Sequence, residues 1–187
     1  MMSRVGVPRR CSSIATALAL ALCSAALGGS SVGEPPPELT TTDYVAIQQL
    51  YARFNTALDT AQPEEFAGTW TDDGEFIGGR GPGRSGESRT PIAGRAQLLE
   101  MARRAGIGPR HFVANLVIRP TAEGASASCY LLLLNARKSP LKFTESAIYE
   151  DTVVRTARGW KFKKRINWRD DDDISPYKPK PLSGLAP

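Results

Sequence analysis

The stretch RHFVANLVI, residues 110–118, marks the point where the chain changes from a helical pattern to a run of strands. Its aromatic and β-branched residues are typical of a strand. It also contains His111, the only histidine among the 187 residues. Histidine is the one side chain whose ordinary pKa, about 6.5, allows proton exchange near neutral pH. His111 is therefore a candidate for proton transfer, and the alternative is a hydrogen-bonded strand residue without a catalytic role.

Three further strands are predicted after this stretch. Turn sequences at residues 121–124, 137–140 and 157–159 separate apolar segments that end near residue 168. Consecutive strands joined by short turns predict an antiparallel meander. The segment 125–135 is apolar on both of its faces, so the face turned away from the core needs a cover, and we expect a homodimer.

The last predicted strand, residues 160–168, alternates apolar and polar side chains. Strand geometry places such sets on opposite faces, so one set is expected to face the core and the other to lie on the polar face. The apolar set is Trp160, Phe162, Ile166 and Trp168, and the polar set is Lys161, Lys163, Arg165 and Asn167.

Upstream of residue 110, three helices are predicted. Apolar residues recur at steps of three and four between Asp43 and Asp59, with Thr41 or Thr42 available as N-cap. A short second helix begins at Pro63, and a third covers residues 94–104. Helices followed by a meander predict the α+β class, with the helices packed on one face of the sheet.

Two connecting segments are predicted to lie in solvent. The turn 71–74 leads into a brief strand at residues 75–77, and its adjacent acids Asp72 and Asp73 are interpreted as a capped, solvated turn and not as a metal site. The glycine- and arginine-rich segment 78–89 has no phosphate-loop spacing and is expected to form a mobile loop, which is able to act as a lid.

Residues 1–30 have the pattern of a secretory signal peptide: a basic start, a short apolar run at residues 14–22 and small residues after it. The run is well short of the roughly 20 apolar residues that a spanning helix needs, so no membrane span is predicted. Leu22 disfavours lipid attachment at Cys23. We therefore expect an exported protein.

The predicted boundaries after cleavage are a flexible linker at 31–41, one domain at 42–170 and a disordered C-terminal tail at 171–187. Cys129 is then the only cysteine, so no internal disulfide is possible, and a buried inert thiol is expected. Without the three arginines of the signal peptide, the net charge falls from +5 to +2. This small excess argues against a nucleic-acid partner.

The order of several short motifs resembles the SnoaL-like domains of the nuclear transport factor 2-like superfamily. The motifs are Leu58-Asp59, Pro63-Glu64, Trp70-Thr71-Asp72-Asp73, Ile92-Ala93-Gly94, Arg110-His111, Tyr149-Glu150-Asp151 and Gly159-Trp160-Lys161-Phe162. The resemblance implies a cone-shaped fold, in which a curved antiparallel sheet wraps around the long first helix and encloses an apolar pocket. Relatives with this fold include scytalone dehydratase, ketosteroid isomerase, limonene epoxide hydrolase, polyketide cyclases and the non-catalytic β subunits of ring-hydroxylating dioxygenases.

The resemblance also implies a catalytic pair. In dehydratase-like members, an aspartate at the end of the first helix orients a histidine at the start of a strand, and Asp59 and His111 occupy those positions. Scytalone dehydratase uses a second histidine, which this chain lacks, and Tyr149 and Asp151 stand near that place.

Further candidate ligand contacts are Tyr51, Asn55 and Trp70, besides Tyr149 and Asp151. Tyr51 and Asn55 lie one helical turn apart, and both Tyr51 and Trp70 are equally compatible with core packing. A carboxylate that fixes the imidazole tautomer leaves the second ring nitrogen able to move a proton on a ligand.

The predicted function is an exported enzyme that carries out proton transfer, as dehydration or isomerisation, on a small apolar molecule. The alternative is a non-catalytic protein of the same fold that binds a hydrophobic ligand or serves as an assembly subunit, because one scaffold hosts many functions. The sequence contains no pattern that indicates a redox cofactor, a nucleotide or a metal.

Overall fold

The computed structural model of the protein describes residues 37–78, 90–171 and 174–183. The predicted signal peptide with Cys23, and nearly all of the predicted loop 78–89, lie outside the described residues. Export and a lid therefore stay predictions. Among the described helices, none has the length and apolar character that a membrane crossing requires.

Six strands form one sheet in the order β2-β1-β6-β5-β4-β3. Strands β3 to β6 pair antiparallel with their neighbours in the chain, which confirms the predicted meander. Strand β1 runs parallel to β6, so the sheet is mixed and the predicted antiparallel pairing does not extend to this pair of strands. The strands are β1 Trp70–Ile77, β2 Ile92–Ala93, β3 Pro109–Thr121, β4 Gly124–Asn135, β5 Lys142–Thr156 and β6 Gly159–Arg169.

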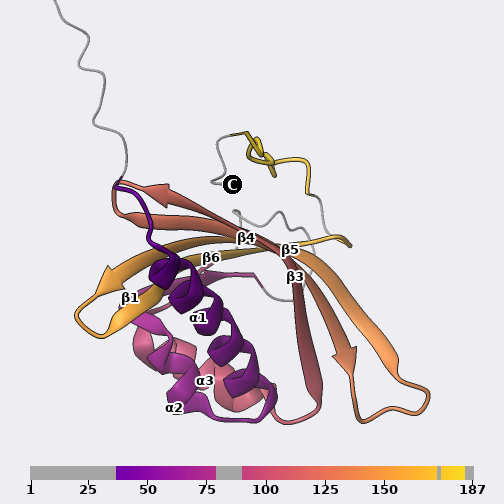
Figure 1. Cartoon of the computed structure of the whole chain (residues 1–187). Helices are drawn as coiled ribbons and strands as arrows, with labels where there is room; N and C mark the ends of the chain where they lie inside the picture. The colour runs from indigo at the N-terminus through magenta and orange to yellow at the C-terminus, as the bar shows by residue number, and fades with distance from the viewer. Residues whose placement is uncertain (1–36, 79–89, 172–173, 184–187) are drawn as a thin grey trace, which may run out of the picture. The chain divides into compact units, whose positions relative to one another are not determined.

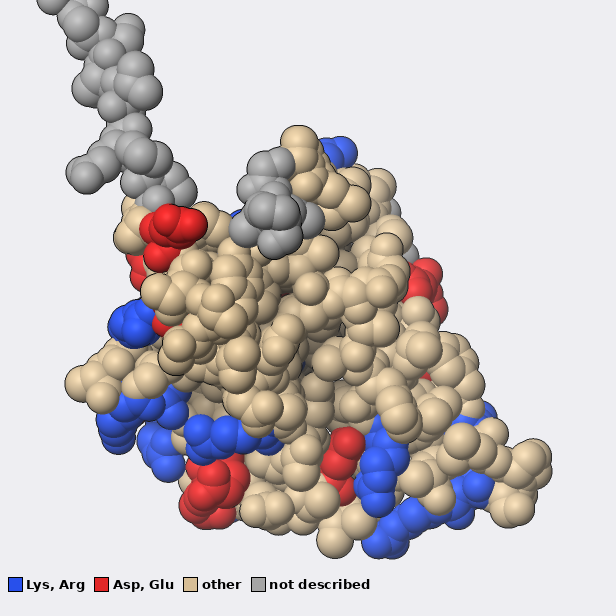
Figure 2. All heavy atoms as spheres, viewed as in Figure 1, with Lys and Arg blue, Asp and Glu red and all other residues tan. Residues whose placement is uncertain are grey.

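The helices α1 Thr41–Asp59, α2 Pro63–Gly68 and α3 Gly94–Ala105 all lie on one side of the curved sheet (Figure 1). The α+β class is thereby confirmed. The apolar stripe of α1 is fully buried against the sheet, as its spacing predicts, and its members include Ile47, Leu50 and Phe54. On the face drawn in Figure 2, basic and acidic side chains are interspersed, and pairs such as Arg104–Glu100 on α3 are exposed.

The start of α1 is fixed by Thr40, one residue before the predicted cap. Thr40 and Asp43 form a capping box, in which each side chain accepts a hydrogen bond from the other residue's backbone N–H. The Asp43 carboxylate also accepts a hydrogen bond from Trp160 Nε1 at 3.1 Å and pairs with Arg155, so it ties α1 to β5 and β6.

A β-bulge at Lys163 changes which side chains of β6 face the core. Val153 pairs with Phe162 and Thr152 with Lys164, so Lys163 has no partner on β5. Beyond the bulge, Arg165 is fully buried on the helix side, while Ile166 and Trp168 form a second apolar cluster with Ile77. The predicted assignment of the two faces of β6 was therefore wrong from Arg165 onward.

Residues 174–183, predicted to be part of a disordered tail, pack against the face of the sheet that faces away from the helices. The ring of Tyr177 lies 5.7 Å from that of Trp168. Arg119 donates a hydrogen bond to the carbonyl oxygen of Pro181 at 2.6 Å, and Lys180 pairs with Glu150. The outward turn of Trp168 at the Lys163 bulge provides the surface on which this segment docks.

The same outer face carries exposed apolar side chains on β3 and β4. Phe112, Tyr130 and Leu132 are 55%, 53% and 45% exposed. Phe112 and Leu132 are register partners, and Tyr130 is two residues from Leu132 on β4, so the three form one patch, called here the outer-face patch. This finding agrees with the sequence analysis, in which the segment 125–135 is apolar on both faces.

Asp43 predicts an acid-dependent part of the stability. Hydrogen bonds from the backbone and side chain of Thr40, with smaller contributions from Trp160 and Arg155, lower the pKa of Asp43 from 3.8 to about 2. A carboxyl group whose pKa is lower in the folded protein stabilises the fold above its unfolded pKa, and loses this effect as pH falls toward the folded value. We expect Asp43→Asn to destabilise the protein at pH 7 and progressively less between pH 4 and pH 2.

Urea unfolding of both proteins across that pH range measures this difference. Glu123→Gln, a change in an exposed turn between β3 and β4, serves as control. If the difference between parent and Asp43→Asn stays constant down to pH 2, Asp43 is not the linked group.

Candidate active site

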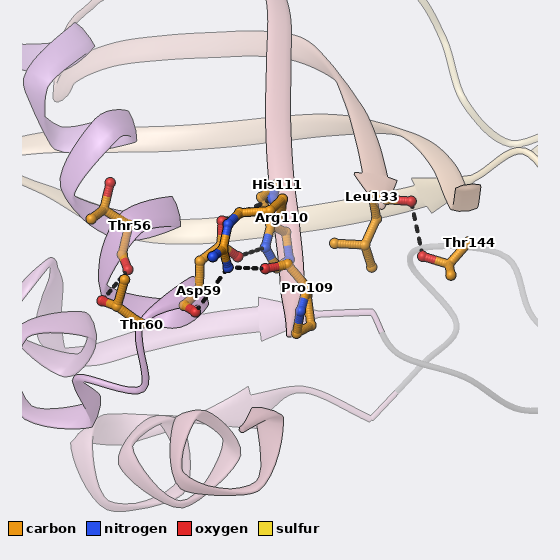
Figure 3. A network of polar contacts seen from close by, with 8 residues as sticks. All are labelled: Thr56, Asp59, Thr60, Pro109, Arg110, His111, Leu133 and Thr144. Atoms are coloured by element: carbon orange, nitrogen blue, oxygen red, sulfur yellow. Dashed lines mark hydrogen bonds and ion pairs between the residues drawn. The ribbon is translucent and has the colours of Figure 1, made fainter. Parts of the chain in front are cut away.

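Asp59 and His111 lie in contact where the end of α1 meets the start of β3 (Figure 3). His111 Nδ1 is 2.5 Å from Asp59 Oδ1, and the backbone N–H of His111 donates to Asp59 Oδ2 at 2.9 Å. Each side chain is only 10% exposed. The two contacts hold the carboxylate in one orientation, so the helix end and the strand start position the imidazole together.

This geometry assigns the roles of the two imidazole nitrogens. A carboxylate only accepts hydrogen bonds, so Nδ1 of His111 carries the proton that faces Asp59. In the neutral ring, Nε2 is then a hydrogen-bond acceptor, and within the described residues it has no hydrogen-bond partner. The His111 side chain lines a cavity. The arrangement is able to accept a proton from a bound molecule while Asp59 stabilises the resulting imidazolium.

The cavity has a volume of about 370 Å³, within the range of small-molecule sites. It lies between α1, α3 and the inner face of the sheet. Most of its wall is apolar and comes from Phe54, Leu58, Phe76, Met101, Ala105, Leu131 and Leu133. Its polar side chains are Arg104, His111, Glu145, Tyr149, Asn167 and Arg169.

A group of charged and amide side chains from β5 and β6 forms one part of this wall. Arg169 Nη1 donates to Glu145 Oε2 at 2.8 Å, and Asn167 Nδ2 donates to Glu145 Oε1 at 3.0 Å. Glu145 and Arg169 are both less than 10% exposed. Sequence reasoning missed these residues. The uninterrupted alternation of β6 placed Asn167 on the polar face, whereas regular alternation along β5 does place Glu145 on the same face as Tyr149 and Asp151. No signal in the sequence locates the bulge that turns Asn167 inward.

Of the five predicted ligand contacts, Tyr149 alone lines the cavity. Its hydroxyl has no hydrogen-bond partner within the described residues, and burial raises its pKa above the ordinary value, although nearby Arg165 opposes this. Tyr149 is therefore a protonated hydroxyl group that is able to donate or accept a hydrogen bond at neutral pH.

The other four predicted contacts lie elsewhere and are reassigned. Trp70 packs among aromatic side chains of the core, with its ring 5.5 Å from that of Phe162. Asn55 is buried in α1, and its Oδ1 has no hydrogen-bond partner among the described residues. Tyr51 and Asp151 belong to a buried network beside the cavity. The spacing of Tyr51 along α1 and of Asp151 along β5 correctly predicted that both side chains face the space between the helix and the sheet. Spacing alone does not tell whether such a side chain lines the cavity or lies behind its wall.

Arg165 is the centre of that network and was also missed. Its guanidinium is completely buried and forms two hydrogen bonds to Asp151, of 2.7 and 2.8 Å. The Tyr51 hydroxyl donates to the same carboxylate. The guanidinium also lies over the rings of Tyr149 and Phe54, at 3.9 and 4.3 Å from their centroids. Because these two rings line the cavity, Arg165 supports its wall from behind.

Two neighbouring groups fit the buried character of this layer. Burial, reinforced by Asp151, raises the pKa of Tyr51 well above its ordinary value. Cys129 is buried as predicted, and burial raises the pKa of its thiol to about 12, so the thiolate is not formed at neutral pH. Within residues 37–78, 90–171 and 174–183, no group of three histidine, cysteine or acidic side chains is placed to hold a metal ion.

Comparison with known proteins identifies the family. The model of the SnoaL-like domain family matches residues 39–166, which is more than half of the chain. The protein belongs to the SnoaL-like domain family. No match to a protein of curated function was found.

Solved structures with the same fold cover most of the domain. A Nostoc punctiforme protein of unknown function with a cystatin-like fold matches with 25% identity and a TM-score of 0.62, over 75% of this chain and 100% of that chain. A Catenulispora acidiphila protein, solved in complex with S-DNPA, matches with 31% identity and a TM-score of 0.58, over 70% and 96%. ActVI-ORFA from Streptomyces coelicolor matches with 24% identity and a TM-score of 0.59, over 70% and 98%, which shows a shared fold.

The ion pair beneath the cavity predicts a large effect of a single substitution on stability. Asp151→Asn leaves Arg165 as a buried cation without its counter-charge. Removing one partner of a buried pair typically costs about 3–5 kcal/mol. We expect a loss of that size in the free energy of unfolding, measured with urea at pH 7.

Asp73→Asn is the matched control, because Asp73 pairs with Lys163 on the surface and both side chains are exposed. Such pairs contribute at most about 1 kcal/mol. Equal effects of the two substitutions would show that the buried network does not support the fold.

Proposed function

We propose that this SnoaL-like protein is an enzyme that uses Asp59 and His111 for proton transfer on a small apolar molecule, as dehydration or isomerisation. The observation that carries the proposal is the 2.5 Å contact between Asp59 and the His111 ring on the wall of a largely apolar cavity. A carboxylate that fixes the tautomer of a histidine on a cavity wall is the arrangement that proton transfer requires.

In the proposed reaction, Nε2 of His111 accepts a proton from the ligand, and Asp59 stabilises the imidazolium through Nδ1. The same nitrogen then returns the proton to a leaving hydroxyl group in a dehydration, or to another carbon in an isomerisation. The Tyr149 hydroxyl is placed on the same wall and is able to donate a hydrogen bond to a carbonyl or hydroxyl oxygen of the ligand. The apolar part of the wall, which includes Phe54, Leu58 and Leu131, offers a surface on which an apolar ligand packs.

The relatives support a small-molecule cavity. The Catenulispora acidiphila protein was solved with the small molecule S-DNPA, and it shares 31% identity with this chain. The competing proposal is a non-catalytic ligand-binding or assembly protein of the same family. The exposed outer-face patch favours an assembly role, although it lies on the opposite side of the sheet from the cavity and is compatible with both proposals.

Substitution of the two residues tests the enzyme proposal. His111→Ala removes the proton acceptor, and we expect turnover to fall by about 100- to 10,000-fold. Asp59→Asn disturbs the tautomer and orientation of His111, and a smaller loss is expected. The measurement is a screen of residues 31–187 against hydroxylated polycyclic, terpenoid and steroid-like compounds, read by chromatography and mass spectrometry for loss of water or isomerisation.

Glu150→Gln, on the outer face of β5, is the control and should keep full activity. Circular dichroism checks that each variant is folded. Turnover that persists in His111→Ala would contradict the mechanism. A ligand that binds the parent protein tightly and is never converted would favour the non-catalytic alternative.

We also propose that the outer-face patch is covered by a second copy of the chain. Phe112, Tyr130 and Leu132 form one exposed apolar patch on adjacent strands, and a two-fold related copy presents the same patch. Leu132→Lys places a charge in the patch and should convert a dimer into a monomer at micromolar concentration, as measured by light scattering. Ile107→Lys, at an exposed position outside the patch, should not. A parent protein that is monomeric under these conditions excludes the proposal.

Export stays a proposal that rests on the pattern of residues 1–30. The N-terminal sequence of the protein isolated from its native host tests it, because a chain that still begins at Met1 inside the cell contradicts cleavage.

A further inference from the structure

Glu145 faces His111 across the inner surface of the sheet. His111 on β3 is the register partner of Leu133 on β4, and Leu133 is the register partner of Glu145 on β5. All three side chains line the same cavity. Neighbouring strands lie about 4.8 Å apart, so the Cα atoms of His111 and Glu145 are separated by about 10 Å. A ligand of one or two rings is able to contact both side chains while it lies on Leu133.

Regular alternation along β5 gives Glu145 this position, because the pairing of β5 with β4 is unbroken from Asp151 to Glu145. A β-bulge lies directly before Glu145 in the chain. Leu133 pairs with Glu145 and Leu134 with Phe143, so Thr144 is the additional residue, and its hydroxyl donates to the carbonyl oxygen of Leu133 at 2.9 Å (Figure 3). Residues two apart on a regular strand share a face. Here the bulge separates them: Glu145 lies on the cavity wall, while Phe143 is 53% exposed.

The hydrogen bonds that Glu145 accepts from its neighbours determine which ligand groups it is able to bind. Arg169 donates to one carboxylate oxygen and Asn167 to the other, which holds the group in place as a carboxylate. An ionised carboxylate is an acceptor only and has about four lone-pair positions, so two remain after these bonds. A ligand atom that approaches Glu145 must therefore carry a hydrogen to donate. An ether or carbonyl oxygen at this position would be repelled, because its partial negative charge would lie beside the negative charge of the Glu145 carboxylate.

We propose that Glu145 determines ligand specificity by accepting a hydrogen bond from a hydroxyl or N–H group at the end of the ligand remote from His111. The inference rests on the proposed function and narrows its substrate class. Because Nε2 of neutral His111 is also an acceptor, the cavity selects a compact ring molecule with a hydrogen-bond donor at each of two ends. Arg169 and Asn167 act through Glu145 as positioning residues.

Binding of three matched probes tests this inference without requiring turnover. The probes are 2,7-dihydroxynaphthalene, 7-methoxy-2-naphthol and 2,7-dimethoxynaphthalene, which share one ring system and lose one hydrogen-bond donor with each methyl group added. Loss of a hydrogen bond to a charged group costs about 1.5–3 kcal/mol, and a hydrogen bond between neutral groups contributes less. We therefore expect titration calorimetry of the parent protein to show affinity falling by about 10- to 100-fold for loss of the donor that faces Glu145, and by a smaller factor for loss of the donor that faces His111.

Two glutamines on β5 separate the role of Glu145 from a general effect of charge. Glu145→Gln should reduce the preference for the diol over the monomethyl ether to about threefold or less, because the amide also offers a donor to the ether oxygen. Glu150→Gln removes the same charge on the other face of β5 and should keep the preference. His111→Ala should lower the affinity for the diol. It should not alter the change in preference that Glu145→Gln causes, because Leu133 separates the side chains of His111 and Glu145.

The inference is overturned if the parent protein binds the three probes with equal affinity, if it binds none of them, or if Glu145→Gln keeps the full preference. The first two of these outcomes are measured on the parent protein, so they do not depend on the variants folding. The binding test is also independent of catalysis. Selection for donors without any turnover would contradict the proposed reaction and support the role of Glu145. Turnover without selection for donors would support the reaction and contradict the role of Glu145.

Discussion

The buried ion pair between Arg165 and Asp151 is the interaction on which the architecture of the site depends. Both side chains are completely removed from solvent. Taking two charges out of water costs several kcal/mol for each ion, and their attraction offsets this only when the geometry is close to ideal. The two hydrogen bonds between them, the Tyr51 hydroxyl and the stacked aromatic rings provide that geometry. Helix α1 and strands β5 and β6 are therefore fixed relative to one another directly behind the cavity.

Irregular strand pairing decides which side chains of β5 and β6 face the cavity. The Lys163 bulge turns Arg165 and Asn167 inward, and the Thr144 bulge turns Phe143 to solvent beside the inward-facing Glu145. A regular sheet with the same sequence would turn Ile166 and Trp168 toward the helices and would place Arg165 and Asn167 on the outer face. Bulges are common beside active sites because they re-aim single side chains in this way. Here they also create the outer surface on which Tyr177 docks.

The sequence predicts the elements well where its periodicity is unbroken. The stripe of α1, the turns of the meander and the buried Cys129 follow from spacing and composition alone. Prediction fails at the bulges, because a shift of one residue exchanges the two faces of a strand and leaves no mark in the alternation. The parallel pairing of β1 with β6 is equally hidden, since it joins residues about 90 positions apart. The contact between Asp59 and His111 was expected only through the family resemblance, and Arg165, Glu145 and Arg169 were not found at all.

The two acceptors of the cavity owe their separation to the sheet and not to loops. The register of β3, β4 and β5 places His111 and Glu145 on either side of Leu133. Groups carried on rigid strands keep their spacing more closely than groups on loops, which suits a site that must align a proton donor of the ligand with one nitrogen. Arg169 pairs with Glu145 in the cavity wall and also with Asp171, whereas Asp59 faces the His111 ring. Positive charge that forms on His111 during proton transfer therefore arises directly beside the carboxylate that stabilises it.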